Sequence, residues 1–182
     1  MIRATVLLTA ILATPLFALD TIDISGLESW NLDGDLLNET GVYYPGPLDP
    51  ELGYIILEIN YDITIETIGS SWLSDVNLRY GNSNGTFHGS WPDVLTPGLG
   101  ADFSGTQRFT GSFYTDIHLN PDAEFHVELF ESFDDDPWAA DAILLPGSTM
   151  SFNIFIPSPS TASTLALAGL TLTRRRRRKL HA

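Results

Sequence analysis

The densest group of side chains that could do chemistry is a run of three carboxylates, Asp134-Asp135-Asp136, with Asp141 shortly after it. Adjacent carboxylates repel one another unless solvent or a cation relaxes the repulsion. Calcium takes about six to eight oxygen ligands from carboxylates and loop carbonyls, and an acidic loop between strands is one arrangement that supplies them. The alternative is a solvated loop tip whose charges keep neighbouring sheet edges apart. The sequence therefore leaves open a calcium site at Asp134, Asp135, Asp136 and Asp141.

A second candidate for calcium is the segment Asn31-Leu32-Asp33-Gly34-Asp35, in which alternate oxygens surround a glycine. Neither segment has the full residue order of an EF-hand loop. The histidines predict no zinc site, because three or four ligands must converge on zinc. His118 and His126 have acidic neighbours at strand spacing, and we expect exposed polar positions there.

Acid pairs for glycoside hydrolysis can be assembled from almost any two of the 23 Asp and Glu residues, so pairing alone predicts no enzyme. The sequence has no Gly-x-Ser-x-Gly elbow and no glycine-rich phosphate loop. We therefore expect a protein that is not an enzyme, with a secreted acid-pair hydrolase as the third alternative.

The aromatic residues suggest a different role, which is stacking against sugar rings. Tyr43, Tyr44 and Trp91 fall in long loops, where exposure is expected, whereas Trp72 begins a strand and is expected in the core. These three side chains form the predicted glycan contact of the second hypothesis, a calcium-dependent carbohydrate-binding module.

Charge is distributed very unevenly along the chain. All the acidic residues lie between Asp20 and Asp141, and in that region only Arg79 and Arg108 are basic, which gives a net charge of about −21. Such a body would repel nucleic acid, because nucleic-acid binding depends on Lys and Arg neutralising phosphates. The sequence contains no cysteine, so disulfides and thiolate metal sites are excluded.

The body predicted for residues 19–156 has the pattern of an all-β domain. Its clearest strand runs from Tyr54 to Thr67, where six apolar side chains alternate with polar ones. The apolar set is Ile55, Leu57, Ile59, Tyr61, Ile63 and Ile65. Shorter runs of this kind are residues 21–27, 72–80, 109–119, 124–131 and 150–156. We predict seven to nine antiparallel strands in a single β-sandwich or jelly roll.

The N-terminal residues 1–18 have the features of a signal peptide. Arg3 supplies a basic start, residues 4–13 form an apolar segment, and Ala18 is a small residue at the expected cleavage position. The segment is shorter than a stable membrane span. We expect a signal helix that is handled by the export translocon and removed by signal peptidase.

The C-terminal residues 157–182 form a tail in three parts. Pro157-Ser158-Pro159-Ser160 is followed by a small and apolar run, Thr161 to Thr173, and then by Arg174, Arg175, Arg176, Arg177, Arg178 and Lys179. As a helix the apolar run spans roughly 20 Å, short of the ~30 Å hydrocarbon core. Such a hydrophobic helix would hold transiently in the inner membrane, with its arginines at the cytoplasmic face. The alternative is a solvated basic tail.

This tail resembles the PEP-CTERM sorting signal of exported bacterial surface proteins, with Ser158 where the commonest form has Glu. The resemblance covers about a seventh of the chain and implies processing by an exosortase-like enzyme. A sequence motif found near the end of exported β-domains with this tail is similar to Phe130-Glu131-Ser132-Phe133-Asp134-Asp135 with Ala140-Asp141-Ala142 after it. The strand–acidic loop–strand order also resembles the P-domain β-sandwich that accompanies secreted proteases.

The sequence as a whole predicts an exported, non-catalytic protein of the cell envelope, cell surface or extracellular matrix, with exopolysaccharide as a candidate partner.

Overall fold

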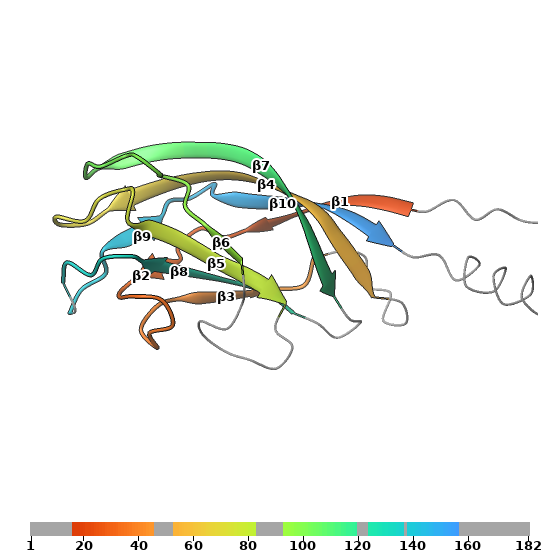
Figure 1. Cartoon of the computed structure of the whole chain (residues 1–182), viewed down its shortest axis with the longest axis horizontal. Coiled ribbons are helices and arrows are strands. Elements are labelled where there is room, and N and C mark those ends of the chain that lie inside the picture. The colour runs from red at the N-terminus through yellow and green to blue at the C-terminus, as the bar shows by residue number, and fades with distance from the viewer. Residues whose placement is uncertain (1–15, 46–52, 83–92, 120–123, 137, 157–182) are drawn as a thin grey trace, which may run out of the picture.

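The computed structural model of the chain describes residues 16–45, 53–82, 93–119, 124–136 and 138–156, which form ten β-strands (Figure 1). Every pairing between these strands is antiparallel, and the strands make two sheets. The strands are β1 (Leu16–Asp23), β2 (Glu28–Ser29), β3 (Thr40–Tyr43), β4 (Tyr54–Thr67), β5 (Val76–Asn82), β6 (Asp93–Leu95), β7 (Thr106–Leu119), β8 (Phe125–Glu131), β9 (Ala142–Leu144) and β10 (Thr149–Ile156). The described part contains no helix that is long and apolar enough to cross a membrane.

The larger sheet is built on β4, whose bounds agree with the sequence prediction. One edge of β4 pairs with β7 along its length, from Tyr54 opposite Leu119 to Glu66 opposite Thr106. The other edge pairs first with β10 and then with β9. Strand β1 lies outside β10, and β2 lies outside β9. A single long strand therefore holds the whole sheet together.

The smaller sheet has the order β3-β8-β5-β6. Every residue of β8 is buried, including His126 and Glu128, which the sequence analysis expected at exposed positions. For Glu128 the burial has a local cause, because residues of the 31–38 segment pack against its carboxylate. Asn38 Nδ2 donates to Glu128 Oε1 at 3.1 Å, and Gly34 N donates to the same oxygen at 3.2 Å.

Both sheets contribute to one hydrophobic core. Phe125 of the smaller sheet meets Phe152 of the larger sheet edge to face, with ring centroids 4.9 Å apart. Tyr80 packs on Phe113 at 5.5 Å and extends the same contact between the sheets. Edge-to-face and tilted pairs of this kind add to the stabilisation from apolar burial.

The inward face of β4 differs in part from the predicted one. The pairing of β4 with β7 shifts register between Ile56 and Glu58, as a β-bulge does. Because a one-residue shift exchanges the two faces of a strand, Ile56 is fully buried while Ile55 and Leu57 are only half-buried. After the bulge the predicted alternation holds, and Ile59, Ile63 and Ile65 lie in the core.

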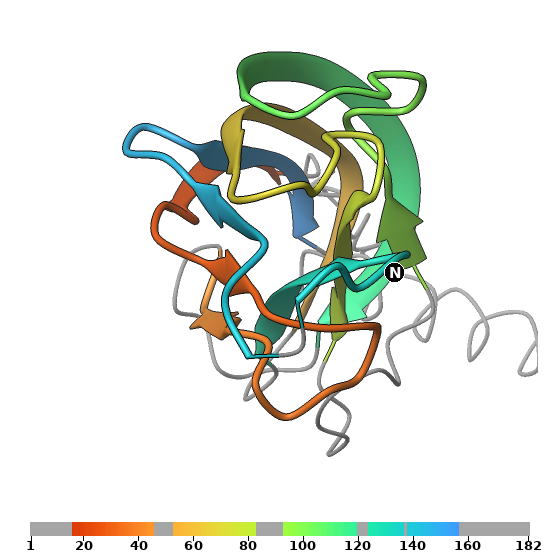
Figure 2. The ribbon, with the colours of Figure 1, turned by 90° about the vertical axis from the view of Figure 1, so that its left-hand side faces the viewer.

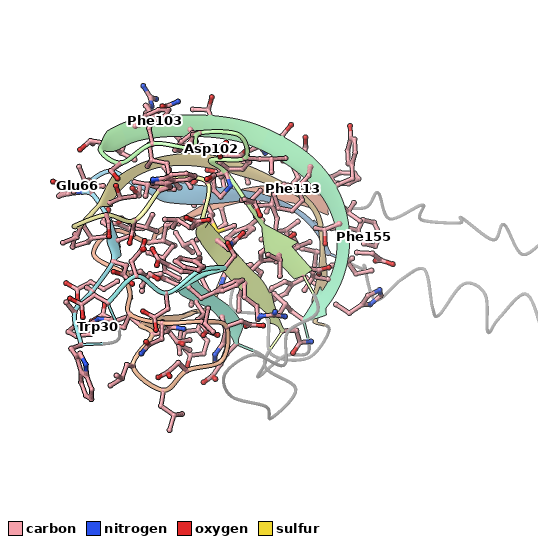
Figure 3. The ribbon with its side chains drawn as sticks, turned by 60° about the vertical axis from the view of Figure 1, so that its left-hand side comes forward. Trp30, Glu66, Asp102, Phe103, Phe113 and Phe155 are labelled. Atoms are coloured by element: carbon pink, nitrogen blue, oxygen red, sulfur yellow. The ribbon has the colours of Figure 1, made fainter. Side chains whose placement is uncertain are left out.

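The chain enters and leaves the two sheets at the same end. Leu16 at the start of β1 is the register partner of Ile156 at the end of β10, and we call this the tail end. The opposite end, the loop end, is formed by residues 24–27, 68–75, 96–105, 132–136, 138–141 and 145–148. Figure 2 looks onto the loop end. In Figure 3, Phe155 lies towards the tail end, whereas Glu66, Asp102 and Phe103 lie towards the loop end.

Other departures from the sequence prediction concern short elements. The predicted number of strands was too low because β2, β6 and β9 contain only two or three residues. Strand β1 begins at Leu16, so the last three residues of the predicted signal peptide pair with β10. Trp72 was wrongly expected in the core: it precedes β5 in a loop and is half-exposed.

We expect Phe152→Ala to lower the free energy of unfolding by about 3–5 kcal/mol, because it opens a cavity where the two sheets meet. Urea denaturation measures the loss. Phe155→Ala, on the half-buried face of the same strand, is the matched control and should cost clearly less. Equal losses for the two variants would contradict the placement of the core.

Candidate functional site

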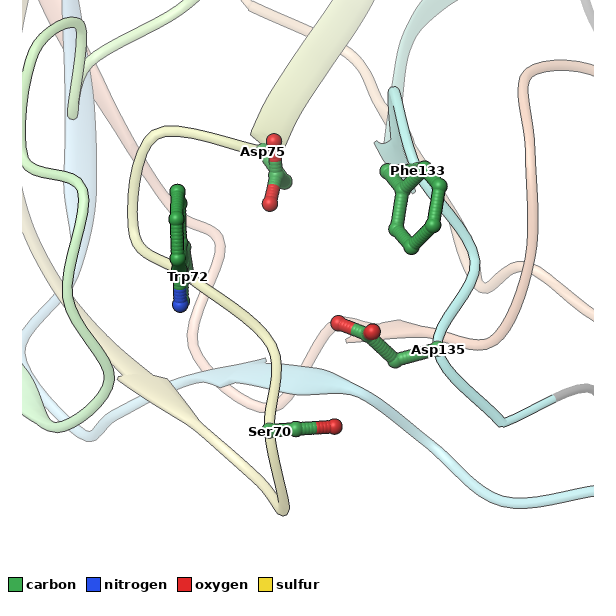
Figure 4. Close-up of a pocket in the computed structure, with 5 residues that line it drawn as sticks. All are labelled: Ser70, Trp72, Asp75, Phe133 and Asp135. Atoms are coloured by element: carbon green, nitrogen blue, oxygen red, sulfur yellow. The ribbon is translucent and has the colours of Figure 1, made fainter.

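A pocket of about 480 Å³ opens at the loop end. Ser70, Trp72 and Asp75, from the loop between β4 and β5, form one side of it. Phe133 and Asp135, from the loop after β8, form the other side. Figure 4 shows the Trp72 and Phe133 rings on opposite sides of the opening, with the two carboxylates and the Ser70 hydroxyl around it.

Backbone hydrogen bonds hold the two walls of the pocket in place. Leu73 N donates to Phe103 O at 3.0 Å and Ser74 N donates to Ala101 O at 3.1 Å, so a third loop supports the Trp72 wall. Ser132 N donates to Asp75 O at 2.9 Å and joins the two walls directly. Gly98 lies against this wall, where an added Cβ would clash with the Leu73 carbonyl oxygen.

The two aromatic side chains of the pocket are open to solvent. Trp72 has 48% and Phe133 has 62% of its surface exposed. Large apolar side chains are normally buried, so a pair of exposed rings on facing walls points to a binding surface. The pocket therefore offers aromatic surface together with carboxylate and hydroxyl groups, which are hydrogen-bonding partners.

Two buried carboxyl groups lie behind the pocket at the same end. Glu131, the last residue of β8, is 0% exposed, and Asp141, just before β9, is 2% exposed. Both carboxylate oxygens of Glu131 and Oδ2 of Asp141 have no hydrogen-bond partner. Buried polar groups are nearly always paired, so this cluster is the most unusual feature of the described part of the chain.

The electrostatics of the pair follow from burial and from neighbouring charge. Burial raises the pKa of Glu131 to about 9, and the nearby carboxyls of Asp141, Asp135 and Asp75 act in the same direction. Burial also raises the pKa of Asp141, although contacts with Glu131 and Ser71 oppose that shift. Ionising both groups together is therefore unfavourable in the absence of a cation.

The structure brings together only part of the predicted calcium set. Asp141 is buried beside Glu131, and Asp135 lines the pocket. Asp134 is half-buried, and its Oδ1 lacks a hydrogen-bond partner. Asp136 has a local role instead, because its Oδ1 accepts a hydrogen bond from Trp138 N at 3.1 Å. Within the described ranges, no three His, Asp or Glu side chains already stand in a metal-ligating arrangement.

The second predicted calcium segment, Asn31 to Asp35, makes structural contacts. Asp33 forms an ion pair with Arg79, including a bond from Arg79 Nε at 2.6 Å. Asn38 Oδ1 accepts hydrogen bonds from the backbone N–H groups of Trp30 and Asn31 at 3.0 and 2.9 Å. Asp35 Oδ1 accepts a bond from Leu37 N at 2.9 Å. This segment folds over the outer face of β8.

The predicted glycan residues lie away from the pocket. Tyr43 pairs with Phe125 at the end of the smaller sheet opposite Glu131, and its ring packs over Gly41. Tyr44 is exposed, and its hydroxyl donates to Glu124 Oε1 at 2.7 Å. Trp91 lies outside the described residues, as do Pro157 to Ser160 and the arginines Arg174 to Arg178 of the predicted sorting signal.

Both arginines of the described residues form ion pairs with carboxylates outside the loop end. Arg79 pairs with Asp33, and Arg108 makes a two-point contact with Asp62 at 2.6 and 2.5 Å. These are the only Lys or Arg residues between positions 16 and 156. The pocket and the carboxyl pair behind it thus favour a neutral or cationic ligand over an anionic one.

Sequence reasoning missed Ser70, Trp72, Asp75, Phe133 and Glu131. A signal for one of them was present, because Glu131 continues the buried series Phe125, Val127 and Leu129 at a spacing of two. An acidic residue that occupies the next position of such an apolar series is expected to point its carboxyl group into the core. The loop residues had no such signal, because their meeting depends on which loops the two sheets bring to one end.

Compared with models of known protein families and with curated proteins, the chain matches none.

The raised pKa of Glu131 should make the stability of the metal-free protein depend on pH. The folded chain binds this proton more tightly than the unfolded chain, so the contribution is full below the unfolded pKa and is lost as pH rises towards about 9. Between about pH 7.5 and 9, where ordinary histidines are already neutral, we expect the free energy of unfolding to fall by at most about 1.4 kcal/mol per pH unit. Urea titrations in EDTA measure this slope.

Glu131→Gln, which cannot ionise, should flatten the profile in this window. Glu66→Gln removes an exposed acid from β4 and should leave the slope in place. A wild-type profile that is flat or rises with pH would contradict the assignment of a protonated Glu131.

Proposed function

We propose that the two sheets form a single β-sandwich that is exported, held at the cell envelope through residues 157–182, and used for non-catalytic binding of a polysaccharide. The observation that carries the proposal is the arrangement of the two ends. The chain enters and leaves at Leu16 and Ile156, whereas the aromatic pocket opens at the opposite end. A domain held through its C-terminal tail would thus present this pocket away from the membrane.

The sorting part of the proposal is supported by the sequence alone. The apolar segment after Arg3, the Pro157 to Ser160 motif and the terminal arginine cluster form the pattern of an exported substrate of an exosortase-like enzyme. The expected partners are the export translocon, signal peptidase and that processing enzyme. Inner-membrane retention by the short apolar segment would be transient, before the protein reaches the cell surface or the extracellular matrix.

The binding part of the proposal is supported by the chemistry of the pocket. Apolar faces of sugar rings stack on aromatic side chains, and sugar hydroxyls donate to carboxylates. Trp72 and Phe133 supply the faces, and Asp75 and Ser70 supply hydrogen-bonding groups. Because the body is strongly acidic, a neutral or amine-bearing exopolysaccharide fits better than an acidic polymer.

Deleting residues 157–182 should release the protein from the envelope into the medium, because the segment expected to hold it is gone. Immunoblots of the membrane, periplasmic and secreted fractions measure the distribution. Replacing Arg174 to Arg178 by serine is a narrower change, and it should reduce retention without altering the body. Envelope retention that survives the full deletion would reject the sorting role.

Trp72→Ala and Phe133→Ala should each reduce binding to exopolysaccharide roughly five- to 150-fold, because one lost aromatic stacking contact is worth about 1–3 kcal/mol. Co-sedimentation with insoluble polysaccharide measures the affinity. Trp138→Ala and Tyr114→Ala are matched controls, because both rings are almost fully exposed and neither lines the pocket.

The same assay tests the other predicted surface. If binding is lost in a Tyr43, Tyr44 and Trp91 triple alanine variant but kept in Trp72→Ala, the glycan site lies near the tail end instead. Unchanged binding in all pocket variants would reject the pocket as the saccharide site.

A further inference from the structure

We propose that Glu131 and Asp141 are the inner ligands of a calcium site, completed by Asp134 and Asp135 from the loop between them. The inference deepens the proposed function, because this loop also carries Phe133, one wall of the pocket. The calcium site itself is argued from the carboxylates alone. Only its effect on polysaccharide binding rests on the proposed function.

The proposal starts from two carboxyl groups, Glu131 and Asp141, that are buried with few hydrogen-bond partners. Glu131 is fully buried and Asp141 almost fully, and the Glu131 oxygens and Asp141 Oδ2 make no hydrogen bond of ordinary geometry. The two carboxyls face each other, and that contact is favourable only while one of them keeps a proton. Leaving buried carboxylates without partners is costly, and a bound cation removes the cost for both at once. The Asp134 Oδ1 atom is a further oxygen without a partner on the same loop.

The backbone fixes the positions of the two inner carboxylates. Glu131 N donates to Asn31 O at 3.1 Å, and Asp141 N donates to Ser29 O at 2.8 Å. Asp141 O also accepts a hydrogen bond from Ile68 N at 2.7 Å. The two residues therefore stand at fixed places on either side of the loop, Glu131 at the end of β8 in the smaller sheet and Asp141 just before β9 in the larger one. An ion between them would tie the two sheets together at the loop end.

The chemistry of the donor set selects calcium. All four candidate ligands are carboxylates, which suit hard cations, and the described contacts place no imidazole among them. Magnesium demands near-ideal octahedral geometry, whereas calcium accepts irregular and bidentate carboxylate sets. An ion bridging a buried pair and a surface loop has the irregular surroundings that calcium tolerates.

In the described residues only the inner pair of such a site stands together. Because no three acidic side chains in the described ranges yet converge, Asp134 and Asp135 would have to move towards the Glu131–Asp141 pair when the ion binds. That movement would shift the part of the loop next to Phe133 and so change the shape of the saccharide pocket. Calcium would then control the pocket by positioning its wall, without contacting the sugar.

The test uses the full chain in mild detergent at constant ionic strength and neutral pH, with no polysaccharide present. Thermal melts in EDTA are compared with melts in about 1 mM calcium, the range in which extracellular calcium modules bind, and in equal magnesium. We expect calcium to raise Tm by several degrees and magnesium to have little effect. Isothermal titration with calcium chloride should give one site per chain.

Glu131→Gln and Asp141→Asn should abolish the calcium shift, while Glu66→Gln, which removes an exposed acid at the same end, should keep it. Glu131→Gln preserves the shape of the protonated acid, and circular dichroism checks that it folds. If it does not fold, Asp135→Asn in the exposed loop replaces it and should weaken calcium binding at least tenfold. No calcium shift, an equal shift with magnesium, or a shift that survives both inner substitutions would overturn the inference.

Because no saccharide enters this experiment, its failure leaves polysaccharide binding untouched. Unchanged saccharide binding in the Trp72 and Phe133 variants would reject the saccharide pocket and leave the calcium result untouched in the same way. If both hold, chelation should weaken polysaccharide binding by the wild-type chain, and it should have no effect on Glu131→Gln.

Discussion

The backbone ladder from β1 through β10 to β4 determines where the rest of the described body lies. Strand β4 carries β7 on one edge and β10 followed by β9 on the other, so the larger sheet depends on this one strand. The antiparallel register of β1 and β10 then brings Leu16 and Ile156 together. Because β8 ends where β4 ends, the loops after both strands meet at the far end and form the pocket.

A second constraint is the imbalance of charge. The body has far more carboxylates than cations, and its two arginines are engaged with Asp33 and Asp62. Among the described carboxylates Glu128, Glu131 and Asp141 are buried, and Glu128 accepts hydrogen bonds from Gly34 and Asn38, whereas Glu131 and Asp141 face each other at the loop end. A protein can hold such a pair by keeping a proton or by binding a cation.

The alternation of apolar residues was enough to predict an all-β body and the bounds of β4. The alternation failed at Leu57, because a bulge exchanges the two faces of the strand. No residue type at this position predicts the bulge. Trp72 was misplaced because an aromatic residue before a strand has the same pattern whether the fold buries it or leaves it in a loop. Asp141 was chosen as an acidic loop residue, but its burial beside Glu131 follows from the pairing of β9, which is too short to predict.

The central claim is that the body is held at its tail end and presents its loop end outwards. The chain has no cysteine, so a single cysteine can be placed at Leu99, exposed at the loop end, or at Tyr44, exposed towards the tail end. Labelling of intact cells with a membrane-impermeant maleimide compares the two sites. The account predicts faster labelling at position 99 than at 44 on cells, and similar rates after detergent release. Equal rates on cells, or faster labelling at position 44, would contradict it.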